Sequence, residues 1–217
     1  MSRKEICKRY LLFILSLFFI GLGIALTKHG ELGISPVSSV ANVVSIKFTF
    51  FSFGTWLTIS NCVLLLGQIL LLRKNFKPIQ LLQIPLSFLF GYFTDFGLYL
   101  AGFIPNELYI AKLLLIIVGS TVLAFGITLG VIANVILNSA EAFVKALSDV
   151  THKEFSDVKI IFDVLWVILS IFLSLAFFDG KLLGTREGTI ISAVLTGFTV
   201  KLWIKFMKKP IESLLTH

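Results

Sequence analysis

Long apolar stretches alternate with short polar or charged ones along almost the whole chain. Six of these stretches approach or exceed the roughly 20 residues that an α-helix needs to cross the hydrocarbon core of a bilayer. They cover residues 10–28, 53–72, 80–100, 109–133, 158–178 and 188–207. Because lipid offers the backbone no hydrogen-bond partner, each stretch is predicted to be a transmembrane α-helix. The pattern therefore predicts an all-α, polytopic membrane helical bundle.

Two shorter segments interrupt this pattern, at residues 35–48 and 138–152. Each carries polar side chains on one helical face and apolar ones on the others. At about 1.5 Å per helical residue, neither is long enough to cross some 30 Å of hydrocarbon comfortably. Each is predicted to be either a half-helix that enters the membrane and returns, or an amphipathic helix that lies in the interface.

The chain also repeats itself. From Gly23 it reads GIALTKHGELGISPVSSVANVVS, and from Gly126 it reads GITLGVIANVILNSAEAFVKALS, which aligns without a gap at an offset of 103. Phe51-Ser52 aligns with Phe155-Ser156 at an offset of 104. A duplicated membrane unit is a common way to build a transporter.

The repeat divides the chain into residues 1–105 and 106–217. Each half has three long stretches and one short segment, and the second half adds a C-terminal tail that is expected to be cytoplasmic. Because three crossings are an odd number, the two halves are predicted to be inverted relative to one another, as a 3+3 internal repeat.

Composition excludes a soluble protein. The chain is 57% hydrophobic and 14% charged, with a mean hydropathy of +0.97, and a soluble domain of 217 residues cannot hide that much apolar surface. The formal net charge of +7 comes from residues at the ends of the apolar stretches, so it indicates membrane topology and not nucleic-acid binding. The first stretch has the length of a full span and lacks a convincing cleavage site, so it is interpreted as a retained helix.

The basic residues predict the orientation. With the N-terminus inside, thirteen lysines and arginines flank the cytoplasmic ends of the spans and five flank the outer ends, while Lys201 is left inside the last span. The loop with Arg73, Lys74 and Lys77 is the most basic internal connection. Both termini are therefore predicted to be cytoplasmic.

The two short segments supply most of the candidate site residues. Ser35 is a good N-cap and Pro36 suits the first helical position, while Asn138 and Glu141 form an approximate capping box in the second segment. As half-helices, the two segments would turn N-terminal N–H groups toward an anion or a carboxylate. The candidate substrate-binding residues are Ser35, Pro36, Ser38, Asn42, Asn138, Ser139 and Glu141.

Three ionisable residues inside the spans are candidates for coupling or gating: Asp95, Lys159 and Asp163. Such groups are costly in lipid and usually face a cavity or a partner. Lys159 and Asp163 are four residues apart, so a local ion pair near the cytoplasmic headgroups is the alternative. Asp95 is expected either to have a cationic or hydroxyl partner from a neighbouring helix or to be a protonatable site. Lys201 occupies the equivalent position in the second half, and inversion predicts that it extends to the cytoplasmic surface instead of pairing with Asp95.

No feature of the sequence indicates an enzyme, a cofactor or a metal. Cys7 and Cys62 are placed too far apart for a disulfide to be expected, and no Cys/His cluster has the spacing of a metal site. No Ser-His-Asp or paired-carboxylate arrangement is recognisable. The glycine-rich turn at 184–189 lacks a Walker pattern and is interpreted as the entry to the last helix.

Four motifs together resemble the YczE/YyaS/YitT-like bacterial integral membrane proteins. They are LGISP after the first helix, FGYFTD in the third, FSDVKIIFDV in the fifth and GTREGTI in the sixth. The resemblance covers nearly the whole chain and implies a multi-pass protein of the bacterial plasma membrane whose biochemical role is undefined. Members often carry Pro-Trp-Asp after the first helix, where this chain has Pro36-Val37-Ser38. Asp95, Asp163, Gly188 and Thr189 match positions that the family tends to keep.

Three functions are compatible with these features. The first is a transporter or exporter of a small, unidentified solute, with an anion as one candidate, bound at the repeat interface near mid-membrane. The second is an accessory membrane protein that acts through partner proteins, and the third is a substrate-binding subunit of an energy-coupling-factor importer. The third class is not expected to show the internal duplication. The expected partners are the lipid bilayer and the solute, and a homodimer or a partner membrane protein stays open.

Overall fold

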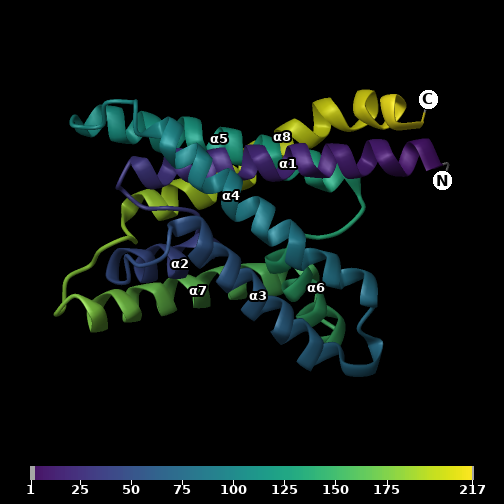
Figure 1. The fold of residues 1–217 in the computed structure, drawn as a ribbon, viewed down its shortest axis with the longest axis horizontal. Helices are drawn as coiled ribbons and strands as arrows, with labels where there is room; N and C mark the ends of the chain where they lie inside the picture. Colours follow the sequence, from purple (N-terminus) through teal and green to yellow (C-terminus); the bar gives the residue numbers. More distant parts are fainter. Residues whose placement is uncertain (1–2, 217) are drawn as a thin grey trace.

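The protein forms a bundle of eight α-helices within residues 3–216, which are the residues that the computed structural model describes (Figure 1). The helices are α1 (Arg3–His29), α2 (Pro36–Lys47), α3 (Phe53–Leu72), α4 (Gln83–Ala101), α5 (Tyr109–Ala133), α6 (Ser139–Thr151), α7 (Phe155–Phe177) and α8 (Glu187–Thr216). Two short 3₁₀ segments, η1 (Arg73–Asn75) and η2 (Pro78–Leu82), connect α3 to α4.

Six of the helices are long and apolar enough to cross a membrane, by length and composition. They coincide with the six predicted stretches, so the all-α membrane bundle is confirmed. The boundaries differ by three residues or more at four ends, one of which is the start of α7 at Phe155 instead of residue 158. The first helix already begins at Arg3 and the last continues to Thr216, while the stretch predicted from residue 80 begins as the 3₁₀ segment η2.

Helices α1 and α5 form the centre of the bundle, and 56% of the residues in the most apolar stretch of each are buried. They run antiparallel, because Arg9 donates a hydrogen bond to the carbonyl of Ile132 while Gly23 packs against Gly119. A methyl group at Gly23 would lie 2.7 Å from the Gly119 carbonyl oxygen. The small residues therefore let two backbones approach closely, as is common between membrane helices.

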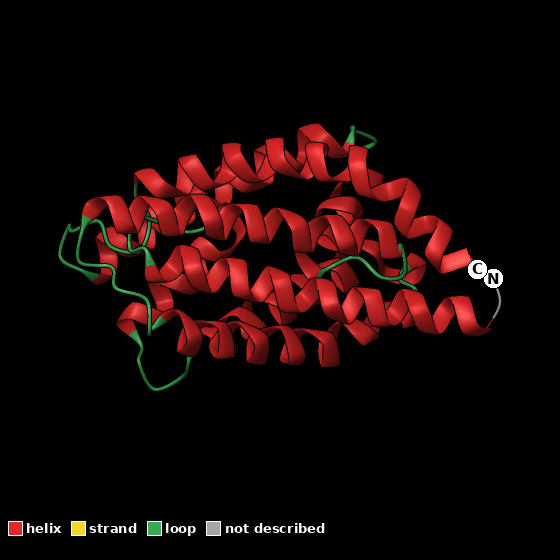
Figure 2. Cartoon of the chain, turned by 90° about the horizontal axis from the view of Figure 1, so that it is seen from above, coloured by secondary structure: helices red, strands yellow, loops and turns green. Residues whose placement is uncertain are grey.

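The remaining helices pack in a regular pattern, in which α4 and α8 contact this centre and the others pack mainly on one another. Helix α4 packs on α1 and α8 packs on α5, while α2 packs on α7 and α6 packs on α3 (Figure 1). Figure 2 shows that the long helices extend along the long axis of the molecule and that both termini lie at the same end. The hydrogen bond from Lys8 Nζ to the Leu214 carbonyl, 3.0 Å long, links the two terminal helices there.

The short helices α2 and α6 lie inside the bundle. Residues Ser38, Ser39 and Val43 of α2 are buried, as are Ala140 and Val144 of α6. Each short helix begins where the preceding chain turns into the bundle, and each packs on a long helix of the other half of the sequence. This placement brings both of their N-termini to the same cavity.

Candidate functional site: a cavity between the two halves

A cavity of about 800 Å³ lies between the two halves of the chain. Its volume is in the range of known small-molecule sites. Apolar side chains of α1, α3, α4 and α5 form one wall, among them Ile24, Leu57, Phe90 and Leu123. The polar lining comes from α3, from the N-terminal ends of α2, α6 and α7, and from one face of α8.

The N-terminus of α2 reaches this cavity with no side-chain cap. Ser35 occupies the N-cap position, as predicted, yet its side chain accepts no hydrogen bond from the first turn. Its hydroxyl donates instead to the hydroxyl of Ser38, 3.0 Å away. Pro36, the first helical residue, has no N–H group. Ser35, Pro36 and Ser38 all line the cavity.

The N-terminus of α6 is capped by its own side chains. Asn138 Oδ1 accepts a hydrogen bond of 2.8 Å from the backbone N–H of Ser139. Glu141 lies in the first turn, and its Oε2 atom is buried without a partner among the described residues. Burial raises the pKa of Glu141, against the opposing effects of Lys159 and of hydrogen bonds from its own backbone and from Asn138.

Five charged side chains line the cavity: Glu141, Lys145, Lys159, Asp163 and Lys201. Lys159 and Asp163 form an ion pair with a distance of 2.6 Å between Lys159 Nζ and Asp163 Oδ1, on the face of α7 that lines the cavity. Lys145 also lines it but pairs with Asp149 at 2.5 Å. Lys201 of α8 is the third lysine, and within residues 3–216 no ion pair involves it.

Two further polar side chains line the cavity and lack partners. Asn61 of α3 is 6% exposed and its Nδ2 atom makes no hydrogen bond within the described part of the chain; the same holds for the hydroxyl of Thr196 on α8. The sequence pattern does not single out Asn61, Thr196 or Lys201 as site residues. The one available signal was spacing, because Ser192, Thr196 and Val200 recur every four residues on one face of α8.

Three of the predicted residues lie outside the cavity lining. Asn42 connects elements, since its Oδ1 accepts a hydrogen bond from Lys28 Nζ and its Nδ2 donates to the carbonyl of Gly184 at 2.7 Å. Ser139 is buried beside Gln68, which donates to the Ser139 carbonyl at 3.1 Å. The periodicity of the short segments correctly indicates a polar face, but it does not reveal which polar residue faces which neighbour.

Asp95 is the third of these residues, and it holds α3 against α4. Its carboxylate accepts a hydrogen bond of 2.5 Å from the Ser52 hydroxyl and one of 2.7 Å from the backbone N–H of Gly54. Both donors belong to the N-terminus of α3, where an acidic group is electrostatically favourable. The hydrogen-bond partners of this acid are therefore a hydroxyl and an amide at the start of a neighbouring helix, and Lys28 also acts on it electrostatically.

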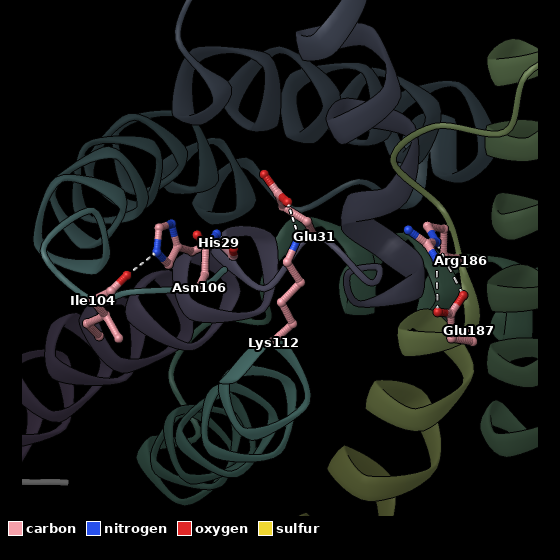
Figure 3. Close-up of polar contacts among 7 residues, drawn as sticks. All are labelled: His29, Glu31, Ile104, Asn106, Lys112, Arg186 and Glu187. Carbon is pink, nitrogen blue, oxygen red and sulfur yellow. Dashed lines mark hydrogen bonds and ion pairs between the residues drawn. The ribbon is translucent and has the colours of Figure 1, made fainter. Parts of the chain in front are cut away.

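The end of the bundle away from the termini is closed by polar contacts (Figure 3). His29 Nε2 lies 2.7 Å from the carbonyl of Ile104, and Asn106 Nδ2 donates to the carbonyl of His29 at 2.7 Å. Lys112 pairs with Glu31 at 2.5 Å. These contacts tie the end of α1 to the loop before α5 and to α5 itself.

The motifs LGISP and GTREGTI meet at the beginning of α8. The backbone N–H of Gly188 donates to the carbonyl of Leu32 at 2.8 Å, and the N–H of Ile34 donates to the Thr189 hydroxyl at 3.3 Å. Arg186 and Glu187 form an exposed ion pair of 3.2 Å beside this junction (Figure 3). The glycine-rich turn is thus the entry to α8, and it also anchors the loop before α2.

The fold defines an integral membrane protein: a helical bundle with six apolar helices of membrane-spanning length and a cavity lined by polar and apolar side chains of both halves. The chain belongs to a family of unknown function, DUF6198, whose sequence pattern matches residues 7–205. Neither a curated protein nor a solved structure matches the chain.

Proposed function

We propose that the protein is a transporter of a small solute, with the central cavity as its binding site. The observation that carries this proposal is the convergence of two short-helix N-termini, Asn61 and the charged residues of α7 and α8 on one cavity of about 800 Å³. Intramembrane polar groups are costly, and in transporters they mark the substrate pathway. An accessory protein has no need for such a cavity.

The packing of α1 on α5 supports an inverted repeat. Gly23 packs against Gly119, and shifting both residues by the repeat offset of 103 gives Gly126 and Ser16. This second pair is also in contact, because a methyl group at Gly126 would lie 2.9 Å from the Ser16 carbonyl oxygen. A two-fold axis between antiparallel helices is perpendicular to them. We therefore propose that residues 10–100 superpose on 113–207 by a rotation of about 180° around an axis in the membrane plane.

The same exchange holds for the other helices, since α1 packs on α4 as α5 packs on α8, and α2 packs on α7 as α6 packs on α3. This relation argues against the substrate-binding subunit of an energy-coupling-factor importer. The resemblance to the YczE/YyaS/YitT-like proteins, the bacterial plasma membrane and the cytoplasmic position of the termini stay predictions.

One experiment tests transport without knowledge of the solute. In a chain with Cys7→Ser and Cys62→Ala, a single cysteine replaces Ser60, which lines the cavity. A membrane-impermeant thiol reagent is applied to intact cells and to inside-out vesicles. A transporter alternates the access to its site, so we expect labelling from both sides. Labelling from only one side would contradict transport and favour the accessory function.

Two control positions calibrate this experiment and test the orientation. Asn75 lies in the basic η1 segment and Glu107 in the loop before α5, and both are exposed. A cysteine at Glu107 is expected to react from outside the cell, and one at Asn75 only from the cytoplasmic side. The reverse order would overturn the orientation.

A further inference from the structure

We propose that the cavity binds an amphipathic organic anion, with its carboxylate at the N-terminus of α2 and its apolar part against the wall formed by α1, α3, α4 and α5. This inference rests on the proposed function and names the class of solute. Its evidence is the difference between the two short helices, one unpaired buried amide, and the distribution of charge and apolar surface around the cavity.

Helix α6 shows, within the same chain, what the N-terminus of α2 lacks. Its first turn carries Glu141, whose carboxyl group receives hydrogen bonds from its own backbone N–H and from Asn138. At the repeat offset of 103, the residue of α2 equivalent to Glu141 is Ser38. Helix α2 therefore has no acid of its own in the first turn, and its N-cap side chain makes no capping bond. A carboxylate of a bound ligand would occupy at α2 the place that the Glu141 carboxyl group occupies at α6.

Asn61 supplies an independent pointer to a ligand. Its side chain is 6% exposed, it lines the cavity, and its Nδ2 donor has no partner in the described residues. A buried donor without an acceptor is unfavourable, and a bound acceptor oxygen removes that cost. The donor of Asn61 and the uncapped end of α2 can both be satisfied by an acceptor oxygen, and the helix N-terminus favours one that carries negative charge.

The charges of the cavity favour an anion over a cation. The charged groups that face it are Glu141, Lys145, Lys159, Asp163 and Lys201. Lys145 and Lys159 each pair with an acid, whereas none of the ion pairs found within residues 3–216 includes Lys201. The carboxyl group of Glu141 is held at the N-terminus of α6 by hydrogen bonds from its own backbone N–H and from Asn138. The uncompensated positive charge is thus that of Lys201 and of the α2 terminus.

The remaining wall sets the other half of the chemistry. Ile20, Ile24, Leu57, Phe90 and Leu123 present a continuous apolar surface to the cavity. A small hydrophilic ion such as inorganic phosphate would leave this surface uncovered, while an alkyl or aromatic group attached to the carboxylate would bury it.

The test uses the full chain in zwitterionic phospholipid nanodiscs and measures its thermal unfolding with four probes. The probes are 3-phenylpropanoate, 3-phenylpropanamide, 3-phenylpropylamine and inorganic phosphate. A ligand that binds only the folded state raises the unfolding temperature in a saturable manner. We expect such a rise with the carboxylate and none with the other three. An equal rise with the amide, the amine or phosphate would overturn, respectively, the role of charge, its sign, or the role of the apolar part.

Two variants at Ser35 then locate the carboxylate. Aspartate is a favoured N-cap, so Ser35→Asp is compatible with folding and places a competing negative charge at the α2 terminus. Its affinity for 3-phenylpropanoate is expected to fall on the order of tenfold or more. Ser35→Asn caps the helix without charge and is expected to stay within about threefold of the wild type. Unchanged affinity in Ser35→Asp would overturn the assignment.

Asn61→Leu keeps the branched shape and the number of heavy atoms of the side chain and removes the unpaired donor, so it provides a second variant that does not change α2. It is expected to weaken the carboxylate several-fold with no loss of thermal stability; wild-type affinity would remove Asn61 from the site. The outcome is separable from that of the proposed function. Two-sided labelling at Ser60 with no carboxylate binding would leave a transporter with another class of solute, and binding without two-sided labelling would leave a receptor.

Discussion

Helices α3 and α4 of the first half and their counterparts α7 and α8 of the second half differ in how they pack. Helix α3 packs along α4, whereas the described residues of α7 and α8 hardly touch. In the most apolar stretches of α3 and α4, 33% of residues are buried, against 17% in α7 and 11% in α8. Where α3 and α4 pack closely together in the first half, the corresponding helices α7 and α8 stay apart and line the cavity.

Three positions account for this difference. In the first half, Gly54 lies against Gly91, and Asp95 caps the end of α3. At the offset of 104, Val158 takes the place of Gly54. In the last helix the offset is 106, which makes Gly197 the counterpart of Gly91, and a methyl group at Gly197 would meet nothing within 4 Å. Lys201 replaces Asp95 and lines the cavity. The duplicated sequence thus gives a closed seam between α3 and α4 and an open seam between α7 and α8, which agrees with one state of the proposed transporter with inverted repeats.

The largest effect is expected from adding a methyl group to the closed seam. In Gly91→Ala, the new Cβ would lie 2.5 Å from the Gly54 carbonyl oxygen, so α3 and α4 must separate. We expect a loss of about 1–3 kcal/mol in the free energy of unfolding, measured by SDS titration in mixed micelles. Gly197→Ala is the matched control in the open seam, and it is expected to be neutral or to gain up to about 1 kcal/mol. Equal losses in both variants would contradict the comparison.

The second effect concerns the acid of the closed seam. Asp95→Asn retains one acceptor oxygen but turns an amide donor toward either the Ser52 hydroxyl or the Gly54 N–H. We expect a loss of about 1–2 kcal/mol in the free energy of unfolding. Lys201→Met, at the equivalent position in the open seam, is expected to change it by less than about 0.5 kcal/mol. Wild-type stability of Asp95→Asn would show that this acid does not hold the seam.

The third effect is a pH dependence specific to α6. Because the pKa of Glu141 is raised in the folded protein, the folded state binds a proton more tightly than the unfolded state. Its contribution to stability is fully present below the ordinary glutamate pKa and is lost as the pH rises through the raised value. Glu141→Gln does not titrate, so its unfolding temperature should rise relative to that of the wild type as the pH increases. The corresponding difference in the free energy of unfolding grows by at most about 1.4 kcal/mol per pH unit.

This comparison is made from pH 5 to pH 9 with Glu107→Gln as the control, an exposed acid at the other end of the bundle. The charged groups that line the cavity together with Glu141 are Lys145, Lys159, Asp163 and Lys201, and all of them are retained in both variants. A constant difference between Glu141→Gln and the wild type across this range would rule out the burial of a titrating carboxyl at α6.

The smallest effect is expected at Asn61, whose counterpart at the offset of 104 is Leu165. Asn61→Leu removes a buried unpaired donor, so we expect the free energy of unfolding to stay level or to rise by no more than about 1 kcal/mol. The measurement is the same SDS titration, with Thr58→Val as the control. Thr58 is buried and donates a hydrogen bond of 3.0 Å to the Ser87 carbonyl, so its replacement should cost stability. A larger loss at Asn61 than at Thr58 would mean that Asn61 has a partner.

The sequence predicts the long helices because their signal is local. Twenty consecutive apolar residues leave few alternatives in lipid, and the starts of α2 and α6 follow from Ser35-Pro36 and from Asn138 in the same way. The Lys159–Asp163 contact is also local, since it spans one helical turn.

The parts that could not be predicted depend on contacts between distant segments. Asn42 and Ser38 lie on the same polar face, yet Asn42 binds Lys28 and Gly184 while Ser38 faces the cavity. Nothing in the sequence around Thr196 distinguishes it from other positions of a helix, and it is a site residue only because the open seam lies beside it. The environment of a side chain within the bundle depends on which helix packs against it, and a single sequence does not identify that helix.

The way α2 and α6 exchange partners has a consequence for synthesis. The helix that α2 packs on, α7, emerges from the ribosome more than a hundred residues after α2 is complete. At about 5–20 residues per second, α2 waits roughly 5–20 s without its partner. During this time the helix against which its serines become buried is absent. We therefore expect α2 to stay at the membrane surface or bound to the insertion machinery until α7 arrives. Assembly of the first half therefore has to be completed by the second, and the two halves expressed as separate polypeptides are expected to be stable only together.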